Sequence, residues 1–186
     1  MNPLIRLKLV GAGILLAALA PAIGAEPSLM AHAQIKDQKG DHVGTADLME
    51  TRGGLLIKLA LQNMKAGQHA VHLHEVGRCD PPFTTAQAHF NPDHHKHGML
   101  VGEGHAGDLP NLHIPDSGEL EVELLTTKVT LEQGKPNSLL NQDGTSLVIH
   151  ATSDDYQSDP AGDSGDRIAC GVISSPSTTG AGSTRK

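Results

Sequence analysis

Apolar and polar residues alternate with a period of two in several short stretches of the chain, and turn residues separate these stretches. This pattern is typical of β-strands that bury one face. It predicts eight strands, at residues 30–35, 43–49, 55–61, 69–76, 109–114, 120–129, 146–151 and 168–173. We find no convincing amphipathic helix and no internal repeat in the sequence.

Residues 79–110 show no regular alternation of apolar and polar residues and are rich in Gly, Pro and His, so we expect a long loop there. Short strands linked by turns indicate an all-β fold, an antiparallel sandwich or barrel. A loop of this length usually carries a function or is disordered. This one holds most of the chain's histidines, which favours a function.

The N-terminal 25 residues have a different pattern. Residues 2–8 contain two basic side chains and no acid, and residues 9–25 form an uncharged run rich in Ala and Leu. This pattern predicts a secretory signal peptide at residues 1–25. We expect cleavage after Ala25, with cleavage after Ala33 as the rival. An uncleaved membrane anchor is the second choice. The apolar run at 9–25 is somewhat short for a spanning helix, which needs roughly 20 residues.

The composition bounds the possible partners. Fourteen basic and 21 acidic residues give the 186-residue chain a net charge of -7, and aromatic residues make up only 2%. An acidic chain without aromatic stacking platforms is a poor partner for nucleic acid. The length suits one domain, or at most two small ones, and we place a single domain at 26–173. Residues 174–186 are rich in Ser, Thr and Gly and are predicted to be a disordered tail.

The chain contains two cysteines, Cys79 and Cys170. In an exported protein a single pair most often forms one disulfide. Two free thiols, or thiolate ligands beside the histidines, remain as alternatives.

Eight of the 12 histidines fall between positions 69 and 105. His72 and His74 are two residues apart on a predicted strand, so their side chains project from the same face. Two imidazoles on one rigid face make half of a metal site, although two solvated surface histidines are the plainer interpretation. His150 ends an apolar run, and a buried imidazole needs a partner or a metal.

A second cluster lies in the long loop and consists of His89, His97, His105 and Asp108. Three imidazoles and one carboxylate match a closed tetrahedral zinc site. Imidazole ligands also suit copper, nickel and iron. The residues therefore predict two neighbouring metal sites in an exported β-protein, without specifying the reaction.

Five segments resemble the signatures of the copper,zinc superoxide dismutases of the bacterial periplasmic type. In chain order they are GQHAVHLHEVGRC (67–79), AHFNP (88–92), KHG with GHAGDL (96–98 and 104–109), LVIH (147–150) and GDRIACGVI (165–173). The resemblance covers roughly residues 30–173. It implies an eight-stranded antiparallel Greek-key sandwich or flattened barrel with long metal-binding loops.

The resemblance also implies one copper and one zinc ion per chain. The copper ligands would be His72, His74, His89 and His150. The zinc ligands would be His89, His97, His105 and Asp108. His89 would then bridge both metals.

Further roles follow from the same resemblance. Asp154 would be the carboxylate that links a ligand of each metal, with Asp155 as its rival by one place. His69 would be a structural histidine beside the site, and Arg167 would guide and hold the substrate anion. Cys79 and Cys170 match the family disulfide.

The implied reaction is the conversion of superoxide to dioxygen and hydrogen peroxide. Copper would alternate between two oxidation states, His89 would act as ligand and proton carrier in turn, and zinc would order the loop. The protein would act in the periplasm as a monomer or homodimer, without membrane attachment after signal cleavage. A non-catalytic copper- or zinc-binding domain on the same scaffold is the alternative, and a structural domain with incidental histidines is a third.

Three features depart from the family pattern. Ala70 and Val71 stand where the family usually has Gly-Phe, which should alter packing behind the copper strand. His94 and His95 could compete for zinc, although we expect them to face solvent. The loop at 151–166 holds five aspartates and no Lys or Arg. Attraction of superoxide must then be local, from copper and Arg167, with Lys96 as a lesser candidate.

Overall fold

The computed structural model describes residues 29–176, which contain nine β-strands and one short 3-10 helix, η1 (Thr84–Ala86). The strands are β1 (Met30–Asp37), β2 (His42–Thr51), β3 (Gly54–Leu61), β4 (Gly67–His69), β5 (Val71–His74), β6 (Leu112–Ile114), β7 (Leu120–Thr126), β8 (Thr145–His150) and β9 (Arg167–Ile173). The predicted signal peptide, and positions 177–186 of the predicted tail, lie outside the described residues.

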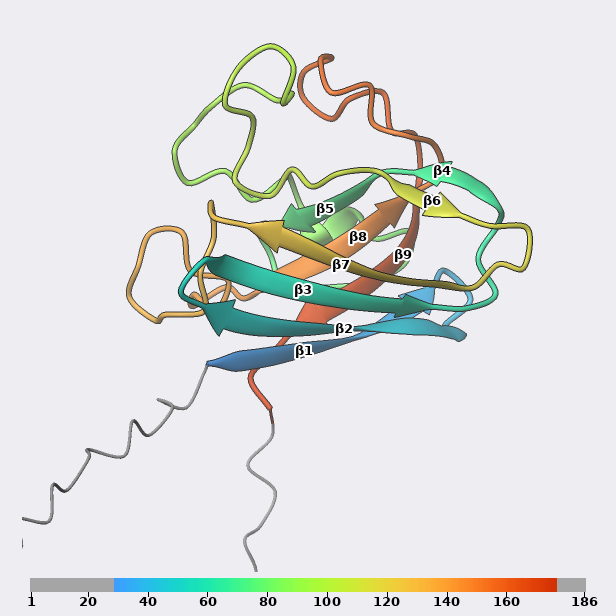
Figure 1. The fold of residues 1–186 in the computed structure, drawn as a ribbon, viewed down its shortest axis with the longest axis horizontal. Helices are drawn as coiled ribbons and strands as arrows, with labels where there is room; N and C mark the ends of the chain where they lie inside the picture. The colour runs from blue at the N-terminus through green and yellow to red at the C-terminus, as the bar shows by residue number, and fades with distance from the viewer. Residues whose placement is uncertain (1–28, 177–186) are drawn as a thin grey trace, which may run out of the picture.

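Seven strands form one curled antiparallel sheet in the order β5-β8-β9-β1-β2-β3-β7, and β4 pairs with β6 in a second, two-stranded sheet (Figure 1). The prediction of an all-β antiparallel fold is confirmed. The strands β7 and β8 are consecutive in the chain but lie far apart in the sheet order. The connection at 127–144 therefore crosses from one edge of the sheet toward the other.

The region predicted as one strand at 69–76 is divided into β4 and β5. Ala70 stands between them, and its backbone bonds to the end of β8 and to the loop after it, and not to β6. Its N–H donates to the carbonyl of Thr152 at 2.8 Å, and its own carbonyl accepts the N–H of His150 at 2.9 Å. As a result, β4 pairs with β6 whereas β5 pairs with β8. Hydrophobic periodicity gives no signal for such a change of partner.

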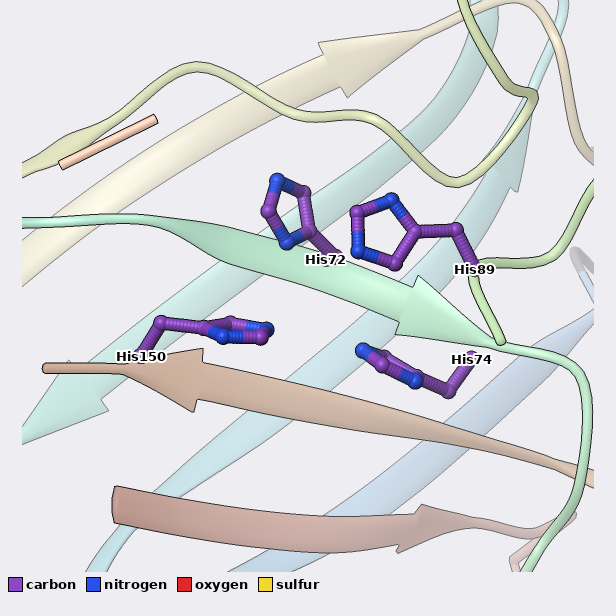
Figure 2. A group of neighbouring side chains, drawn as sticks. All are labelled: His72, His74, His89 and His150. Carbon is purple, nitrogen blue, oxygen red and sulfur yellow. The ribbon is translucent and has the colours of Figure 1, made fainter. Parts of the chain in front are cut away.

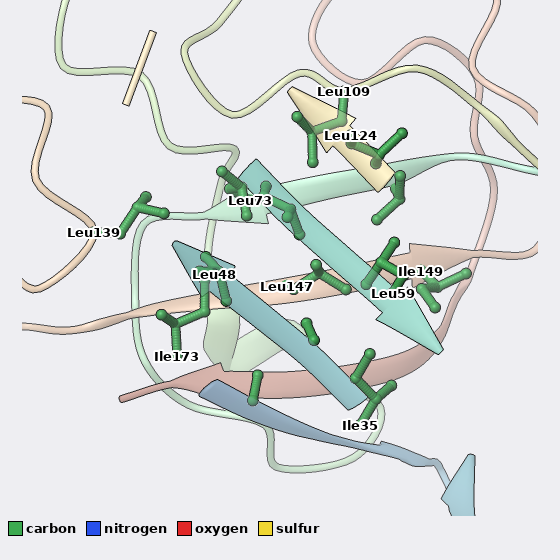
Figure 3. Close-up of a cluster of buried hydrophobic side chains, with 14 of the residues drawn as sticks. Ile35, Leu48, Leu59, Leu73, Leu109, Leu124, Leu139, Leu147, Ile149 and Ile173 are labelled. Atoms are coloured by element: carbon green, nitrogen blue, oxygen red, sulfur yellow. The ribbon is translucent and has the colours of Figure 1, made fainter. Parts of the chain in front are cut away.

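The hydrophobic core lies on the inner face of the curled sheet (Figure 3). Alternate residues of β3 point into it: Leu55, Ile57, Leu59 and Leu61 are all buried. Burying one such side chain contributes about 1.5–3 kcal/mol to the free energy of folding. Val71 and Leu73 of β5 join this core, so the strand that carries His72 and His74 is held rigidly from behind.

Two long loops lie together beyond one side of the sheet, one at 75–111 and one at 151–166 (Figure 1). The backbone N–H of His97 in the first loop donates to Asp159 of the second at 2.8 Å. Leu100 likewise donates to the carbonyl of Tyr156 at 3.1 Å. Across residues 29–176, the structure contains no helix with the length and hydrophobicity needed to cross a membrane.

Candidate metal centre

The first group of candidate ligands consists of four histidines whose rings converge (Figure 2). β5 supplies His72 and His74, the end of β8 supplies His150, and the long loop supplies His89. One ring nitrogen from each lies within 4.8 Å of those of the others. All four residues are buried, with exposed fractions between 0% and 4%. The structure thus brings together the four residues predicted to hold copper.

Backbone pairing places His89 in this group although it lies in a loop. The loop returns beside β5, where His89 forms an antiparallel bridge with His74. Glu75 donates to the carbonyl of Ala88 at 3.0 Å, and Phe90 donates to that of Leu73 at 2.8 Å. The His89 side chain is therefore fixed by sheet-like hydrogen bonds on either side of it.

The second group shares His89 with the first and adds three residues of the loop, His97, His105 and Asp108. The Asp108 carboxylate lies at its centre. One oxygen is 3.0 Å from Nδ1 of His89, and the other is 3.1 Å from Nδ1 of His97. Nδ1 of His105 lies 3.3 Å from Nδ1 of His89. The structure therefore also brings together the residues predicted to hold zinc.

Five ring nitrogens in these two groups are buried and have no hydrogen-bond partner among the described residues. They are His72 Nδ1, His74 Nε2, His89 Nε2, His97 Nδ1 and His150 Nε2. Although His97 Nδ1 lies close to an Asp108 oxygen, the two atoms do not form a hydrogen bond. A buried polar atom without a partner costs about 1–3 kcal/mol. Five such atoms at one place would be a large penalty unless a cation binds them. The chemistry of the groups fits this, because neutral imidazoles bind copper and three imidazoles with a carboxylate bind zinc.

Asp154 connects the two groups, because it forms a hydrogen bond with one histidine of each. Its carboxylate accepts hydrogen bonds from Nε2 of His72 at 2.9 Å and from Nε2 of His97 at 3.0 Å. These bonds place the hydrogen on Nε2 of each ring and leave Nδ1 free, the tautomer that a metal on Nδ1 requires. Asp155 is exposed and accepts hydrogen bonds from Ser158. The structure therefore favours Asp154 over Asp155 for the linking position.

Burial keeps the imidazoles in their neutral form. It lowers the pKa of His89 to about 4 and that of His150 to about 3, and it holds the pKa of His74 well below 6.5. For Asp108, burial opposes ionisation, but hydrogen bonds from His105 and His89 outweigh it and hold the pKa below its usual range. Neutral imidazole and ionised carboxylate are the forms that bind metals.

His69 belongs to neither group. Its Nδ1 lies 2.8 Å from the carbonyl oxygen of His150, and its Nε2 lies 2.9 Å from that of Lys65. Both nitrogens are therefore occupied by backbone carbonyls, and the side chain is buried. The structural role of His69 beside the site stays a prediction.

A cleft of about 810 Å³ leads to the first group, and His89, His150 and Arg167 line it. The Arg167 guanidinium donates to the carbonyls of Phe83 and Gln87, each at 2.7 Å. These bonds fix the positive charge at the wall of the cleft. Carboxylates of Glu75, Asp159 and Asp163 also line the cleft.

The remaining basic or imidazole candidates of the loop lie elsewhere. His94 and His95 are exposed residues that line the cleft and belong to neither group of candidate ligands. Lys96 is exposed and is not among the residues lining the cleft. Arg167 is therefore the basic side chain that the described structure places at the cleft wall.

Cys79 and Cys170 form a disulfide, so the alternatives of free thiols and thiolate ligands are wrong. Cys170 lies in β9, the strand that Arg167 begins. Cys79 opens the segment that includes Phe83 and Gln87, the acceptors of the guanidinium. The disulfide thus joins the segment that supplies the acceptors to the strand that supplies Arg167.

Two further residues, Asn111 and Tyr156, contact Asp154. The Asn111 side-chain amide donates to the Asp154 carbonyl and accepts its N–H, both at 2.8 Å. Tyr156 donates its backbone N–H to the Asp154 carboxylate at 2.6 Å. An isolated Asn and the chain's one Tyr fit no metal-ligand pattern, so the sequence carried no signal for them.

Comparison with known proteins finds a family model and relatives that match most of the chain. The family model described as copper/zinc superoxide dismutase matches residues 42–173. Superoxide dismutase [Cu-Zn] 1 of Aquifex aeolicus is 53% identical over 78% of this chain and 88% of its own length. Superoxide dismutase [Cu-Zn] of Caulobacter vibrioides is 38% identical over 77% of this chain and 84% of its own.

Solved structures with the same fold include two bacterial proteins. Cu/Zn superoxide dismutase from Brucella abortus superposes with a TM-score of 0.66 at 28% identity, covering 78% of this chain and 99% of the other. A SOD-like protein from Bacillus subtilis superposes with a TM-score of 0.73 at 34% identity, covering 76% and 96%.

Proposed function

The chain belongs to the copper/zinc superoxide dismutase family, and from this premise we propose which of its residues hold the metals and act on the substrate. It is an oxidoreductase that converts superoxide to dioxygen and hydrogen peroxide, with copper and zinc as its cofactors. The assignment of residues below is supported by the geometry of the two groups.

We assign copper to the group of His72, His74, His89 and His150, and zinc to the group of His89, His97, His105 and Asp108. The observation that carries this assignment is the set of five unpartnered ring nitrogens, which belong to two groups sharing one histidine. The unpartnered Nε2 of His89 belongs with the copper group, and its Nδ1 lies beside Asp108 in the zinc group. One copper and one zinc per chain would satisfy all five nitrogens.

Bound copper supplies the one-electron couple that dismutation of superoxide requires, and bound zinc supplies a redox-silent positive charge. His89 is suited to carry a proton at Nε2, because this atom lacks a protein partner and its ring lines the cleft.

Arg167 is the residue that holds the anion near the copper group. Its guanidinium is half-buried at the cleft wall and is fixed by two backbone carbonyls. A fixed, partly desolvated charge attracts an anion more strongly than a mobile surface charge. Because Glu75, Asp159 and Asp163 line the same cleft, Arg167 must act against nearby negative charge.

We propose that the protein is exported to the periplasm after removal of residues 1–25, leaving a mature domain at 26–173 and a tail at 174–186. The support is the basic and then apolar pattern of the first 25 residues, together with a disulfide, which persists in oxidising compartments. The mature protein would be a monomer or homodimer that is not attached to the membrane.

The test is metal content and superoxide-dismutating activity measured on one oxidised, copper- and zinc-loaded sample. We expect about one copper and one zinc per chain together with activity. Full loading without activity would favour the metal carrier as the alternative. Failure to bind either metal would contradict the ligand assignment.

A further inference from the structure

We propose that Tyr156 is a positioning residue for the zinc group, acting through Asn111 and Asp154. The proposal rests on the ligand assignment above and extends it to Tyr156 and Asn111, which are not members of the candidate metal groups. Tyr156 forms hydrogen bonds with three residues. They are Asp154 in its own loop, Asn111 directly before β6, and Leu100 in the loop that carries His97.

The phenol oxygen of Tyr156 accepts the backbone N–H of Asn111 at 2.7 Å. Asn111 in turn pairs with the backbone of Asp154 through both ends of its side-chain amide, each at 2.8 Å. A paired amide of this kind allows one relative orientation of the two segments. The phenol therefore holds Asn111 in place, and Asn111 in turn holds the backbone of Asp154.

Tyr156 also acts on the Asp154 carboxylate directly. Its backbone N–H donates to Oδ1 of Asp154 at 2.6 Å. The same oxygen accepts a hydrogen bond from Nε2 of His97 at 3.0 Å. Tyr156 has a φ of 61°, a left-handed conformation uncommon for a residue of this size. Its side-chain and backbone contacts hold this conformation, which aims the N–H at Oδ1.

The third contact joins Tyr156 to the loop that carries His97. Leu100 donates to the Tyr156 carbonyl at 3.1 Å. Gly98, next to His97, packs so closely that a Cβ there would lie 2.5 Å from the same carbonyl oxygen. Only glycine fits at that contact. The ligand loop and the loop of Asp154 are thus in contact at the backbone of Tyr156.

These contacts converge on the orientation of His97. If Asp154 shifts, Nε2 of His97 loses its acceptor, and the ring is no longer held with Nδ1 toward the zinc group. Loss of a direct carboxylate partner typically lowers metal affinity by about 10- to 100-fold. Tyr156 acts one contact further away, so we expect removal of its hydroxyl to lower zinc affinity by about three- to tenfold.

The experiment compares Tyr156→Phe with wild type in the full chain, fully oxidised. Zinc affinity is measured by competition with a chromophoric chelator, and the Cu(II) electron paramagnetic resonance spectrum is recorded on protein loaded with both metals. Thr130→Val is the matched control, because the Thr130 hydroxyl also accepts a backbone N–H, that of Glu132 at 3.1 Å. Thr130 also donates to Glu50 and is not a member of the candidate metal groups.

We expect Tyr156→Phe to weaken zinc binding and to change the copper spectrum, whereas Thr130→Val leaves both at the wild-type values. Unchanged zinc affinity and an unchanged spectrum in Tyr156→Phe would overturn the proposal. Equal losses in both variants, following their thermal midpoints, would also overturn it, because they would show a general loss of stability. Failure of the wild type itself to bind zinc would instead contradict the ligand assignment.

The wild-type chain offers an independent check. It contains one tyrosine and no tryptophan, so its intrinsic emission reports on Tyr156 alone. We expect this emission to change with the same midpoint as zinc uptake in wild type and in Thr130→Val. Emission that is indifferent to zinc in both proteins would count against coupling between Tyr156 and the zinc group through Asp154.

Discussion

The carboxylate of Asp154 accepts a hydrogen bond from Nε2 of His72 at 2.9 Å, although the two residues are 82 positions apart in the chain. His72 lies on β5, and Asp154 lies in the loop that follows β8. The other oxygen of Asp154 accepts a hydrogen bond from Nε2 of His97. One buried carboxylate therefore orients one ring of each proposed metal group.

Replacement of Asp154 by Asn should weaken zinc binding by about 10- to 100-fold, with a smaller effect on copper. An amide offers one acceptor oxygen where the carboxylate offers two, so His72 and His97 cannot both be held. The measurement is metal content after dialysis against a graded chelator. Asp155→Asn is the control, since Asp155 is exposed and bonds within its own turn. Equal zinc loss in both variants would contradict this role for Asp154.

Replacement of Arg167 by Glu should slow turnover strongly while leaving copper and zinc content intact. We expect a loss of at least about tenfold, because a fixed positive charge in the cleft becomes negative. Arg167→Lys should retain part of the rate, since it keeps the charge but loses the paired hydrogen bonds to Phe83 and Gln87. The check is pulse-radiolysis kinetics beside metal analysis. Loss of metal in Arg167→Glu would argue against the role in steering the anion.

Replacement of Asp163 by Asn should raise the rate with superoxide by about two- to fivefold at low ionic strength, with the gain shrinking as salt is added. Asp163 lines the cleft, so neutralising it removes repulsion along the anion's approach. Its φ of 51° lies in the left-handed region, which Asn also adopts readily. Asp116→Asn, at an exposed position between β6 and β7, is the control. A salt-independent gain, or none, would refute electrostatic repulsion by Asp163.

The metal-free protein should lose stability as the pH falls from about 6.5 toward 4. The pKa of His89 is lowered from 6.5 to about 4 by burial, so the unfolded chain binds more protons than the folded chain in this window. Unfolding then becomes easier with acid, by about 3 kcal/mol for His89 alone. Below this window, the lowered pKa of Asp154 adds a further loss.

Chemical denaturation of chelator-treated protein at a series of pH values measures this dependence. His89→Gln should make the profile between pH 6.5 and 4 less steep, with His74 and His150 still contributing, whereas His113→Gln, at an exposed position of β6, should leave it unchanged. A profile that is equally steep in wild type and His89→Gln would show that other groups control the acid response.

The sequence by itself determined the all-β class, because period-2 alternation follows directly from the geometry of a strand with one buried face. It also indicated the chemistry of the site. His72 and His74 share a face on any strand, and His97, His105 and Asp108 lie within one short stretch of loop. Their residue types limit what they can bind, whatever the fold around them.

Only the tertiary structure decided how the two groups meet and what holds them. The change of strand partner at Ala70 depends on hydrogen bonds to Thr152 and His150, which no local pattern encodes. The placement of Asp154 behind both groups, and of Tyr156 and Asn111 around it, depends on two loops that pack together from distant parts of the chain. Hydrophobic periodicity records which residues are buried, but side-chain hydrogen bonds between loops are fixed by three-dimensional packing alone.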